Sequence, residues 1–387
     1  MTAERGGTRV GMVGGGQLAR MTAQAAASLG ITLTVLDPDP SPPAARAGAR
    51  VVVGEPDRLD DLVALAEQVD VVTFDHERVP LGHVRALEAL GHRVAPGSAT
   101  AELAFDKAAS RRRLREHGFP LPRWTEARTV ADVVAFGDAA GWPVVVKAAS
   151  GGYDGRGVTV VDDVTSADAA VARLGPHLVV EALVPFDAEL SVLVARNAVG
   201  KVVGYPPVAT VQRDAMCAEV LSPAPVPASV RRAASSLAER LACTFDLVGV
   251  MAVELFLVGS DLLVNELATR PHNTGHHTIE AAETSQFEQH LRAVLGWPLG
   301  STRSRARAAV TVNVVGRAGD DPRRHLPDAL ALAGAHVHLY GKEPRPGRKL
   351  GHVTALGATA AEARAVAHRA AAALGSPVPA ASTGGAA

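Results

Sequence analysis

Residues 247–267 read LVGVMAVELFLVGSDLLVNEL, two apolar runs separated by the turn-forming residues Gly259, Ser260 and Asp261. Aliphatic and β-branched residues on both sides of a short polar turn are typical of a β-hairpin. If these three residues close the hairpin, Val258 pairs with Leu262. Counting back along both arms then places Glu254 directly opposite Glu266, with Cβ atoms about 4.5–5.5 Å apart.

Glu254 and Glu266 would repel each other in this arrangement, because neither arm of the hairpin carries a basic residue between them. Two facing carboxylates need a cation. A hard ion with oxygen ligands fits best, which favours Mg²⁺, with Mn²⁺ as a possible substitute. The alternative is a register that differs by one residue and leaves one glutamate solvated.

A glycine-rich loop at residues 151–157 separates an expected strand at 142–147 from another at 158–161. A Walker A loop leads into a helix and carries Gly-Lys-Ser/Thr, so this loop is not a P-loop. Its main-chain N–H groups can still turn toward an anion, and phosphate oxygens usually complete a metal site that has only two carboxylates. Together with Lys107 and Lys147, the loop predicts an ATP site that it covers as a lid.

The first hundred residues alternate between apolar strands and helical segments, beginning with a βαβ unit over residues 9–37. This alternation predicts a doubly wound parallel sheet, and the fold class is therefore α/β. Asp37 ends the second strand, as an acid that binds the ribose of NAD would. The glycines, however, follow a G-x-x-G-G-G pattern from Gly11 that lacks the dinucleotide-binding spacing, which disfavours NAD.

The composition of the 387 residues excludes several classes of protein. With 39 Lys plus Arg against 40 Asp plus Glu, no net positive field attracts nucleic acid or an anionic membrane. Two cysteines are too few for a disulfide framework, and residues 1–9 lack the apolar core of a signal peptide. We therefore expect a cytoplasmic protein without a nucleic-acid or membrane partner.

Several motifs together resemble the ATP-grasp enzymes, and within them the N5-carboxyaminoimidazole ribonucleotide synthases of purine biosynthesis. They are GGGQL at 14–18, GYDGRG at 152–157, NEL at 265–267, RPHNTGHHT at 270–278, YGK at 340–342 and GRKLGH at 347–352. The resemblance implies an ATP-grasp fold behind the doubly wound parallel-sheet domain. It divides the chain into an N-terminal domain (1–105), a lid domain (106–185), a catalytic domain (186–375) and a disordered tail (376–387).

The resemblance implies carboxylation of 5-aminoimidazole ribonucleotide (AIR) with ATP and bicarbonate as co-substrates, giving ADP and phosphate by way of carboxyphosphate. It also implies a homodimer, and the labile product raises the possibility of transient hand-over to a mutase. The residues it assigns to ATP are Lys107, Lys147, Gly152, Tyr153, Asp154, Gly155, Arg156, Gly157, Val158, Glu181, Ala182, Leu183, Val184, Glu189, Gln212, Asn265 and Glu266, with Glu254 and Glu266 on the metal.

Catalysis of this reaction asks for charge neutralisation and positioning rather than a nucleophile. We expect Arg270, His272 and Asn273, which follow the metal-binding strand, and Tyr153, Asp154 and Arg156 on the lid, to act on the reacting groups. Expected substrate contacts are Gln17, Leu18 and Glu77, although Glu77 could also be a solvated loop acid. Lys342, Arg345, Arg348 and Lys349 are expected to converge on the 5′-phosphate of AIR, the alternative being a solvated charge run.

Three departures from the family pattern are Ala19, Gln212 and Thr269, and none of them removes a charge that the mechanism needs. His272, His276 and His277 raise the alternative of a zinc site, which adjacent histidines disfavour. The nearest rival function is a formate-using ATP-grasp ligase. A non-catalytic nucleotide-binding module is the rival of another class.

Overall fold

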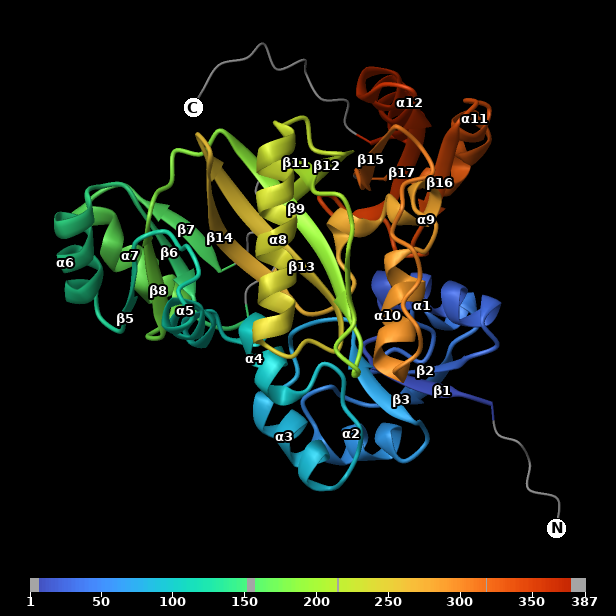
Figure 1. Cartoon of the computed structure of the whole chain (residues 1–387), viewed down its shortest axis with the longest axis horizontal. Coiled ribbons are helices and arrows are strands. Elements are labelled where there is room, and N and C mark those ends of the chain that lie inside the picture. Colours follow the sequence, from blue (N-terminus) through green and yellow to red (C-terminus); the bar gives the residue numbers. More distant parts are fainter. Residues whose placement is uncertain (1–6, 152–156, 214–215, 318, 377–387) are drawn as a thin grey trace.

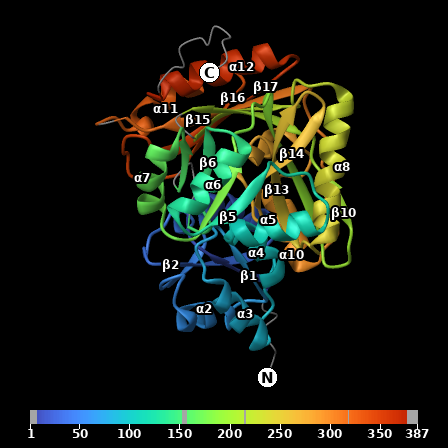
Figure 2. The same ribbon diagram turned by 90° about the vertical axis from the view of Figure 1, so that its left-hand side faces the viewer.

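A computed structural model describes residues 7–151, 157–213, 216–317 and 319–376 (Figure 1). In this part of the chain the strands form three sheets. The first sheet lies at one end of the molecule, the second projects to the side, and the long third sheet runs between the first sheet and the C-terminal helices (Figures 1 and 2). The candidate site lies where residues of the three sheets meet, as the ion pairs Lys107–Glu266 and Arg270–Glu77 show.

The first sheet is parallel, in the order β3-β2-β1-β4, as predicted. Its elements are β1 (Arg9–Val13), α1 (Gln17–Ser28), β2 (Thr32–Asp37), η1 (Ala45–Ala47), β3 (Arg50–Val53), α2 (Leu59–Ala66), β4 (Val71–Phe74) and α3 (Leu81–Ala89). Alanines of α1 pack on one face of the sheet, while leucines of α2 and α3 pack on the other. The sheet is therefore covered on both faces, as a doubly wound fold requires.

The glycine turn between β1 and α1 is closed by the protein's own carboxylates. Asp37 Oδ2 accepts the N–H of Gly15 at 2.7 Å, and Asp75 Oδ2 accepts the N–H of Gly16 at 2.7 Å. Asp75 Oδ1 also accepts the N–H of Ala19 at 3.2 Å. The amides that would hold a pyrophosphate in a dinucleotide-binding fold are thus already occupied by anions, which argues against the NAD alternative.

The second sheet is antiparallel, in the order β5-β8-β6-β7. A linker of α4 (Ser98–Phe105) and α5 (Lys107–Glu116) leads into β5 (Trp124–Ala127), α6 (Val130–Ala140), β6 (Val144–Ala148), β7 (Val158–Val161), α7 (Val164–Leu174) and β8 (Leu178–Ala182). Val144, Val146 and Val180 join the core under α6 and α7. Because side chains alternate along a strand, Lys147 and Glu181 lie on the opposite face.

The third sheet has the order β14-β13-β9-β11-β12-β15-β17-β16, with β10 paired to β9. Its strands are β9 (Ala188–Arg196), β10 (Val202–Gly204), β11 (Val208–Arg213), β12 (Met216–Ser222), β13 (Gly249–Val258), β14 (Asp261–Ala268), β15 (Ala308–Val315), β16 (Ala335–Leu339) and β17 (Lys349–Gly357). Its helices are α8 (Ala228–Thr244), η2 (Asn273–Gly275), α9 (Thr278–Ala281), α10 (Gln286–Leu295), η3 (Pro322–His325), α11 (Leu326–Leu330) and α12 (Ala360–Ala373).

Helices fix the third sheet to its neighbours. α8 covers the β9–β13 part of the sheet, and α12 covers β15 and β17. α10 carries Leu291 and Val294 into the core of the first sheet, where His290 Nε2 also lies 2.8 Å from Thr73 Oγ1. No helix in the described ranges has the length and apolar character needed to cross a membrane.

The tightness of the glycine turn gives a stability prediction. A Cβ at Gly16 would overlap Asp75 Oδ2, whereas a Cβ at Gly82 in α3 would meet nothing within 4 Å. We expect Gly16→Ala to lower the free energy of unfolding by about 1–3 kcal/mol. Gly82→Ala, the matched control, should raise it by about 0.5 kcal/mol because alanine favours a helix. Equal effects of the two variants in urea unfolding would contradict the close approach at Gly16.

Candidate active site

The hairpin of β13 and β14 places the two expected metal ligands opposite each other. The predicted three-residue turn is wrong: Val258 pairs with Asp261, so Gly259 and Ser260 alone form the turn. A β-bulge at Asn265, between the Leu255–Val264 and Glu254–Glu266 pairs, then shifts the register by one residue and restores the predicted pairing of Glu254 with Glu266. The bulge also puts Asn265 and Glu266 on the same face, because the core-facing positions of β14 change from Leu262 and Val264 to Leu267.

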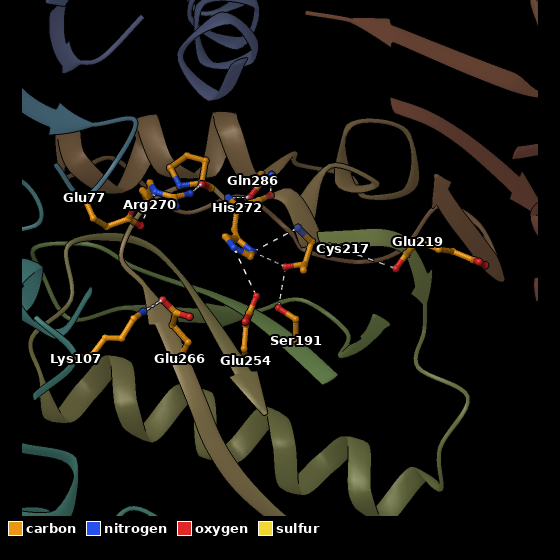
Figure 3. Close-up of polar contacts among 12 residues, drawn as sticks. Glu77, Lys107, Ser191, Cys217, Glu219, Glu254, Glu266, Arg270, His272 and Gln286 are labelled. Carbon is orange, nitrogen blue, oxygen red and sulfur yellow. Dashed lines mark hydrogen bonds and ion pairs between the residues drawn. The ribbon is translucent and has the colours of Figure 1, made fainter. Parts of the chain in front are cut away.

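The two carboxylates have different electrostatic surroundings. Burial, followed by the charges of Glu266 and Glu189, raises the pKa of Glu254 to about 8. Partial burial also acts on Glu266, whose side chain is 47% exposed, but Lys107 together with Lys147 and Arg111 outweighs it and lowers the pKa of that carboxyl. Lys107 Nζ donates directly to Glu266 Oε1 (Figure 3). In the protein alone, one proton and one ammonium therefore relieve the repulsion that a divalent cation would relieve.

A buried ion cluster joins the second sheet to the hairpin. Glu181 Oε1 lies 2.5 Å from Arg111 Nε, and Glu181 Oε2 lies 2.7 Å from Lys147 Nζ. The side chains of Arg111 and Glu181 are only 4% and 3% exposed. Burial alone would raise the pKa of Glu181, but Lys147 and Arg111 outweigh it and lower the pKa to about 2. The charged form is thus the stable form of this carboxyl.

The same cluster holds the bulge. Arg111 Nη2 donates to the main-chain carbonyl of Asn265 at 2.6 Å, and Lys147 Nζ donates to Asn265 Oδ1 at 3.1 Å. Sequence reasoning placed Lys147, Glu181 and Asn265 in the ATP site but missed Arg111, which lies one helical turn after Lys107. That spacing puts both cations on one face of α5.

The other expected nucleotide residues line the junction of the second and third sheets. Glu181 and Ala182 end β8, and Leu183, which follows them, is 46% exposed. Glu189 lies at the start of β9, where burial raises the pKa of its carboxyl against the effect of a hydrogen bond from Gln212. Val184 lies in the link between β8 and β9, and Gly157 and Val158 lead into β7. Gly152, Tyr153, Asp154, Gly155 and Arg156 lie outside the described residues.

The segment after β14 carries Arg270 and His272 to the side that faces Glu254 and Glu266 (Figure 3). Arg270 Nε and Nη2 lie 2.7 and 3.0 Å from the two carboxylate oxygens of Glu77, so Glu77 is an ion-paired residue and not a solvated loop acid. Gln286 accepts the N–H of His272 at 2.8 Å and donates to its carbonyl at 2.7 Å. Gln286 is a helix residue that no motif indicated.

The side chains of Asn273, His276 and His277 differ in their contacts. Both polar atoms of the Asn273 side chain are buried and have no hydrogen-bond partner among the described residues. His276 stacks on His352, with ring centroids 4.7 Å apart, and His277 Nδ1 lies 3.1 Å from the carbonyl of Thr274. The rings of His276 and His277 are thus packed into the fold, although His276 Nε2, like the Asn273 amide, has no hydrogen-bond partner among the described residues. Buried polar atoms without a partner are candidates to contact a ligand.

The expected substrate residues come from both ends of the chain. Lys342 Nζ donates to Gln17 Oε1 at 2.7 Å, which joins two of them across 325 positions. Leu18 is buried beside Phe287 and Tyr340. Arg345 is exposed, Lys349 is buried, and Arg348 donates to the carbonyl of Glu343 in its own loop at 3.2 Å. Convergence of the four cations on one phosphate stays a prediction.

Three family models match the chain. They are described as ribonucleotide synthetase preATP-grasp domain (residues 7–105), ATP-grasp domain (112–287) and phosphoribosylaminoimidazole carboxylase C-terminal domain (309–366). The N5-carboxyaminoimidazole ribonucleotide synthase of Mycobacterium tuberculosis H37Rv is 46% identical over 91% of this chain and 84% of its own length. The chain belongs to the N5-carboxyaminoimidazole ribonucleotide synthases.

Solved structures of this ATP-grasp family have the same fold. The Thermus thermophilus synthetase is 37% identical, with a TM-score of 0.84 over 94% of this chain and 97% of its own. The Aspergillus clavatus synthase is 32% identical, with a TM-score of 0.88 over 95% of this chain and 99% of its own, and that structure contains ADP and AIR. The family predicted from the motifs is therefore confirmed.

The ion cluster gives a prediction for this synthase-family chain. Glu181→Gln leaves Arg111 and Lys147 buried without their counter-charge and should cost about 3–5 kcal/mol of unfolding free energy. Glu126→Gln is the matched control: Glu126 pairs with Arg112, the next residue of α5, but the two side chains are 32% and 42% exposed. That loss should stay below about 1 kcal/mol.

The pH dependence of the difference has a definite sign. A carboxyl whose pKa is lower in the folded state stabilises the fold above its ordinary value of 4.5, and this contribution is lost as the pH falls toward about 2. The difference between wild type and Glu181→Gln in denaturant unfolding should therefore shrink below about pH 4.5. A difference that is constant with pH would contradict the charge assignment.

Proposed function

We propose that this chain carboxylates AIR to N5-carboxyaminoimidazole ribonucleotide, consuming ATP and bicarbonate and releasing ADP and phosphate. Family membership supports the ATP-dependent ligase class. The observation that carries the proposal for this chain is that a carboxylate pair, a cationic cluster and the segment of residues 270–273 lie next to one another. The use of bicarbonate, the binding of Mg²⁺ and the role of each residue are proposed from the chemistry of these carboxylates and cations.

The ATP phosphates are proposed to contact Lys107, Lys147 and the loop that contains Gly157. Both ammonium groups already face carboxylates of the cleft, so they are fixed in place before the nucleotide binds. The Glu181 side chain forms ion pairs with Arg111 and Lys147. We therefore expect the main chain of residues 181–184, and not this side chain, to contact the adenine. Glu189 and Gln212 are proposed to hold the ribose side of the nucleotide.

Glu254 and Glu266 are proposed to hold Mg²⁺. The two carboxylates lie on neighbouring strands, and the raised pKa of Glu254 indicates that it holds a proton when no ion is bound. Carboxylate oxygens, together with phosphate oxygens, are the ligands that Mg²⁺ prefers. When bound, the ion would neutralise charge that develops on the transferring phosphoryl group. Lys107 would then be released from Glu266 toward the phosphates.

The reaction needs bicarbonate to be activated, because bicarbonate is a poor electrophile. A bicarbonate oxygen attacks the γ-phosphorus, and the bond to the bridging oxygen of ADP breaks, which gives carboxyphosphate. The nitrogen of the exocyclic amine of AIR then attacks the carboxyl carbon of carboxyphosphate. The bond from this carbon to the phosphate oxygen breaks, phosphate leaves, and the amine loses a proton. Arg270, His272 and Asn273 are proposed to hold these oxygens, and the reaction requires that water, which would destroy the intermediate, is kept away from it.

AIR is proposed to lie between the first and third sheets, at Gln17, Glu77 and Lys342. Glu77 and Lys342 are each held by another cleft residue, Arg270 and Gln17 respectively. Arg345, Arg348 and Lys349 are proposed to add positive charge for the phosphate, and Tyr153, Asp154 and Arg156 to act from the lid. The domain boundaries, a homodimer, a cytoplasmic location and hand-over of the product to a mutase stay predictions.

The function is tested by ADP formation in a coupled assay. ADP should form only when ATP, AIR and bicarbonate are all present. Formate in place of bicarbonate should give no ADP, which separates this function from the rival formate-using ligase. ATP turnover that needs formate, or binding of ATP without any turnover, would contradict the proposal.

The carboxylate pair gives a second test with a readout other than activity. Because the pKa of Glu254 is about 8, ion binding near neutral pH must displace its proton. Calorimetry of Mg²⁺ with ADP should show affinity rising about tenfold per pH unit up to about pH 8 and then levelling off. Glu254→Gln should remove this dependence and so serve as the reference.

Glu266→Gln should nearly abolish turnover, because it removes one of two charged groups beside the phosphates. Glu283→Gln is the control, since Glu283 pairs with Arg303 at the surface. Wild-type ADP release by Glu266→Gln at ordinary Mg²⁺ concentration, or Mg²⁺ binding that does not change with pH in the wild type, would exclude the metal assignment.

A further inference from the structure

The His272 side chain is held by a chain of buried hydroxyl groups (Figure 3). The main-chain N–H of Thr274 donates to His272 Nδ1 at 3.4 Å, and Thr274 Oγ1 lies 3.0 Å from the same nitrogen. Ser191 Oγ lies 2.8 Å from Thr274 Oγ1. Ser191 and Thr274 are each only 1% exposed, so these bonds are shielded from water.

The direction of each hydrogen bond follows from the main-chain donor. A main-chain N–H can only donate, so His272 Nδ1 accepts and carries no proton. The Thr274 hydroxyl must then donate to Nδ1, since an unprotonated nitrogen cannot donate to it. With that proton used, the Ser191 hydroxyl donates to Thr274 Oγ1. The proton of the neutral imidazole is therefore on Nε2, which lies 3.7 Å from Glu254 Oε1.

The anchor of the chain is part of the same sheet as the carboxylate pair. Ser191 on β9 is directly opposite Glu254 on β13, and Glu254 is directly opposite Glu266 on β14. The third sheet thus fixes the two carboxylates and, through Ser191 and Thr274, the direction of the His272 ring. A ring anchored in this way keeps its Nε2–H aimed at the space beside Glu254.

We propose that Thr274 and Ser191 are positioning residues that fix His272 as the neutral Nε2–H tautomer, so that His272 donates a hydrogen bond to a reacting oxygen. This inference rests on the proposed function, which places carboxyphosphate beside Glu254. It assigns His272 the role of a donor and not of a base for the AIR amine, because Nδ1 is occupied and Nε2 already carries the proton. Neither side chain carries a charge. Ser191 lies in no motif, and Thr274 lies inside the RPHNTGHHT motif without a role assigned to it.

The tautomer is tested by nitrogen NMR of protein labelled with ¹⁵N-histidine, with the His272 signals assigned by their loss in His272→Gln. In the wild type, His272 Nδ1 should give the signal of an unprotonated nitrogen and Nε2 that of a protonated one. Thr274→Val keeps the size of the side chain but removes the hydroxyl, and should give a mixture of tautomers. Ser191→Ala perturbs the same signals without changing the loop that carries Thr274.

The kinetic readout separates positioning from folding. Thr274→Val should lower kcat about tenfold or more and leave the KM for ATP within about twofold, as expected for a residue that orients a catalytic group. Thr274→Ser restores the hydroxyl and should recover most of kcat. The control is Thr311→Val, which removes one hydroxyl of the buried Thr311–Thr354 pair, 2.8 Å apart, on β15 and β17 and outside the Ser191–Thr274–His272 chain. It should leave the His272 signals and kcat unchanged.

Three results would overturn the proposal: a wild-type His272 protonated on Nδ1, His272 signals that are the same in Thr274→Val, or slow turnover that Thr274→Ser fails to restore. The NMR readout does not depend on which reaction the chain catalyses. A tautomer that changes as expected in a protein without AIR-dependent ADP formation would refute the proposed function and leave the positioning role intact. The two failures are therefore distinguishable.

Discussion

Glu254 and Glu266 face each other across neighbouring strands, and this like-charge contact is unfavourable unless a proton or a cation relieves it. In the protein alone the relief comes from the raised pKa of Glu254 and from Lys107. Both are replaceable: a proton can be lost and an ammonium can swing to another anion. A rigid sheet that holds two carboxylates in this state is prepared for a divalent ion and a polyphosphate, because binding removes a repulsion that folding has already imposed.

The bulge at Asn265 connects this carboxylate pair to the rest of the cleft. It turns Asn265 and Glu266 to the same side, where Arg111 and Lys147 bind the one and Lys107 binds the other. The same cations bind Glu181 on the second sheet, so the second and third sheets share one buried ion cluster. A buried cluster of this kind contributes little net stability, but it fixes the register between two elements.

The sequence predicted the parts of the fold that local patterns determine, and it failed where distant contacts decide. The parallel first sheet, the hairpin and the glutamate pairing followed from alternation and from counting residues. The predicted pairing of Glu254 with Glu266 is correct, but the predicted turn is not. A two-residue turn followed by a bulge gives the same register that a three-residue turn would give. Arg111, Gln286 and Ser191 were missed, because their importance comes from partners between 14 and 154 positions away. Asp75 was missed for the same reason: it caps α1 from the end of β4. Thr274 lies inside the RPHNTGHHT motif, but its contact with His272 depends on the local fold, and the motif gave it no role.

The central claim is that bicarbonate is activated by phosphorylation in the cleft beside Glu254 and Glu266. Bicarbonate labelled with ¹⁸O tests it most directly, because the oxygen that attacks the γ-phosphorus stays on phosphorus when carboxyphosphate breaks down. The account predicts that inorganic phosphate formed with AIR and ATP carries one ¹⁸O atom per turnover. Phosphate without ¹⁸O, formed at the rate of ADP release, would show that water attacks ATP and would contradict the account.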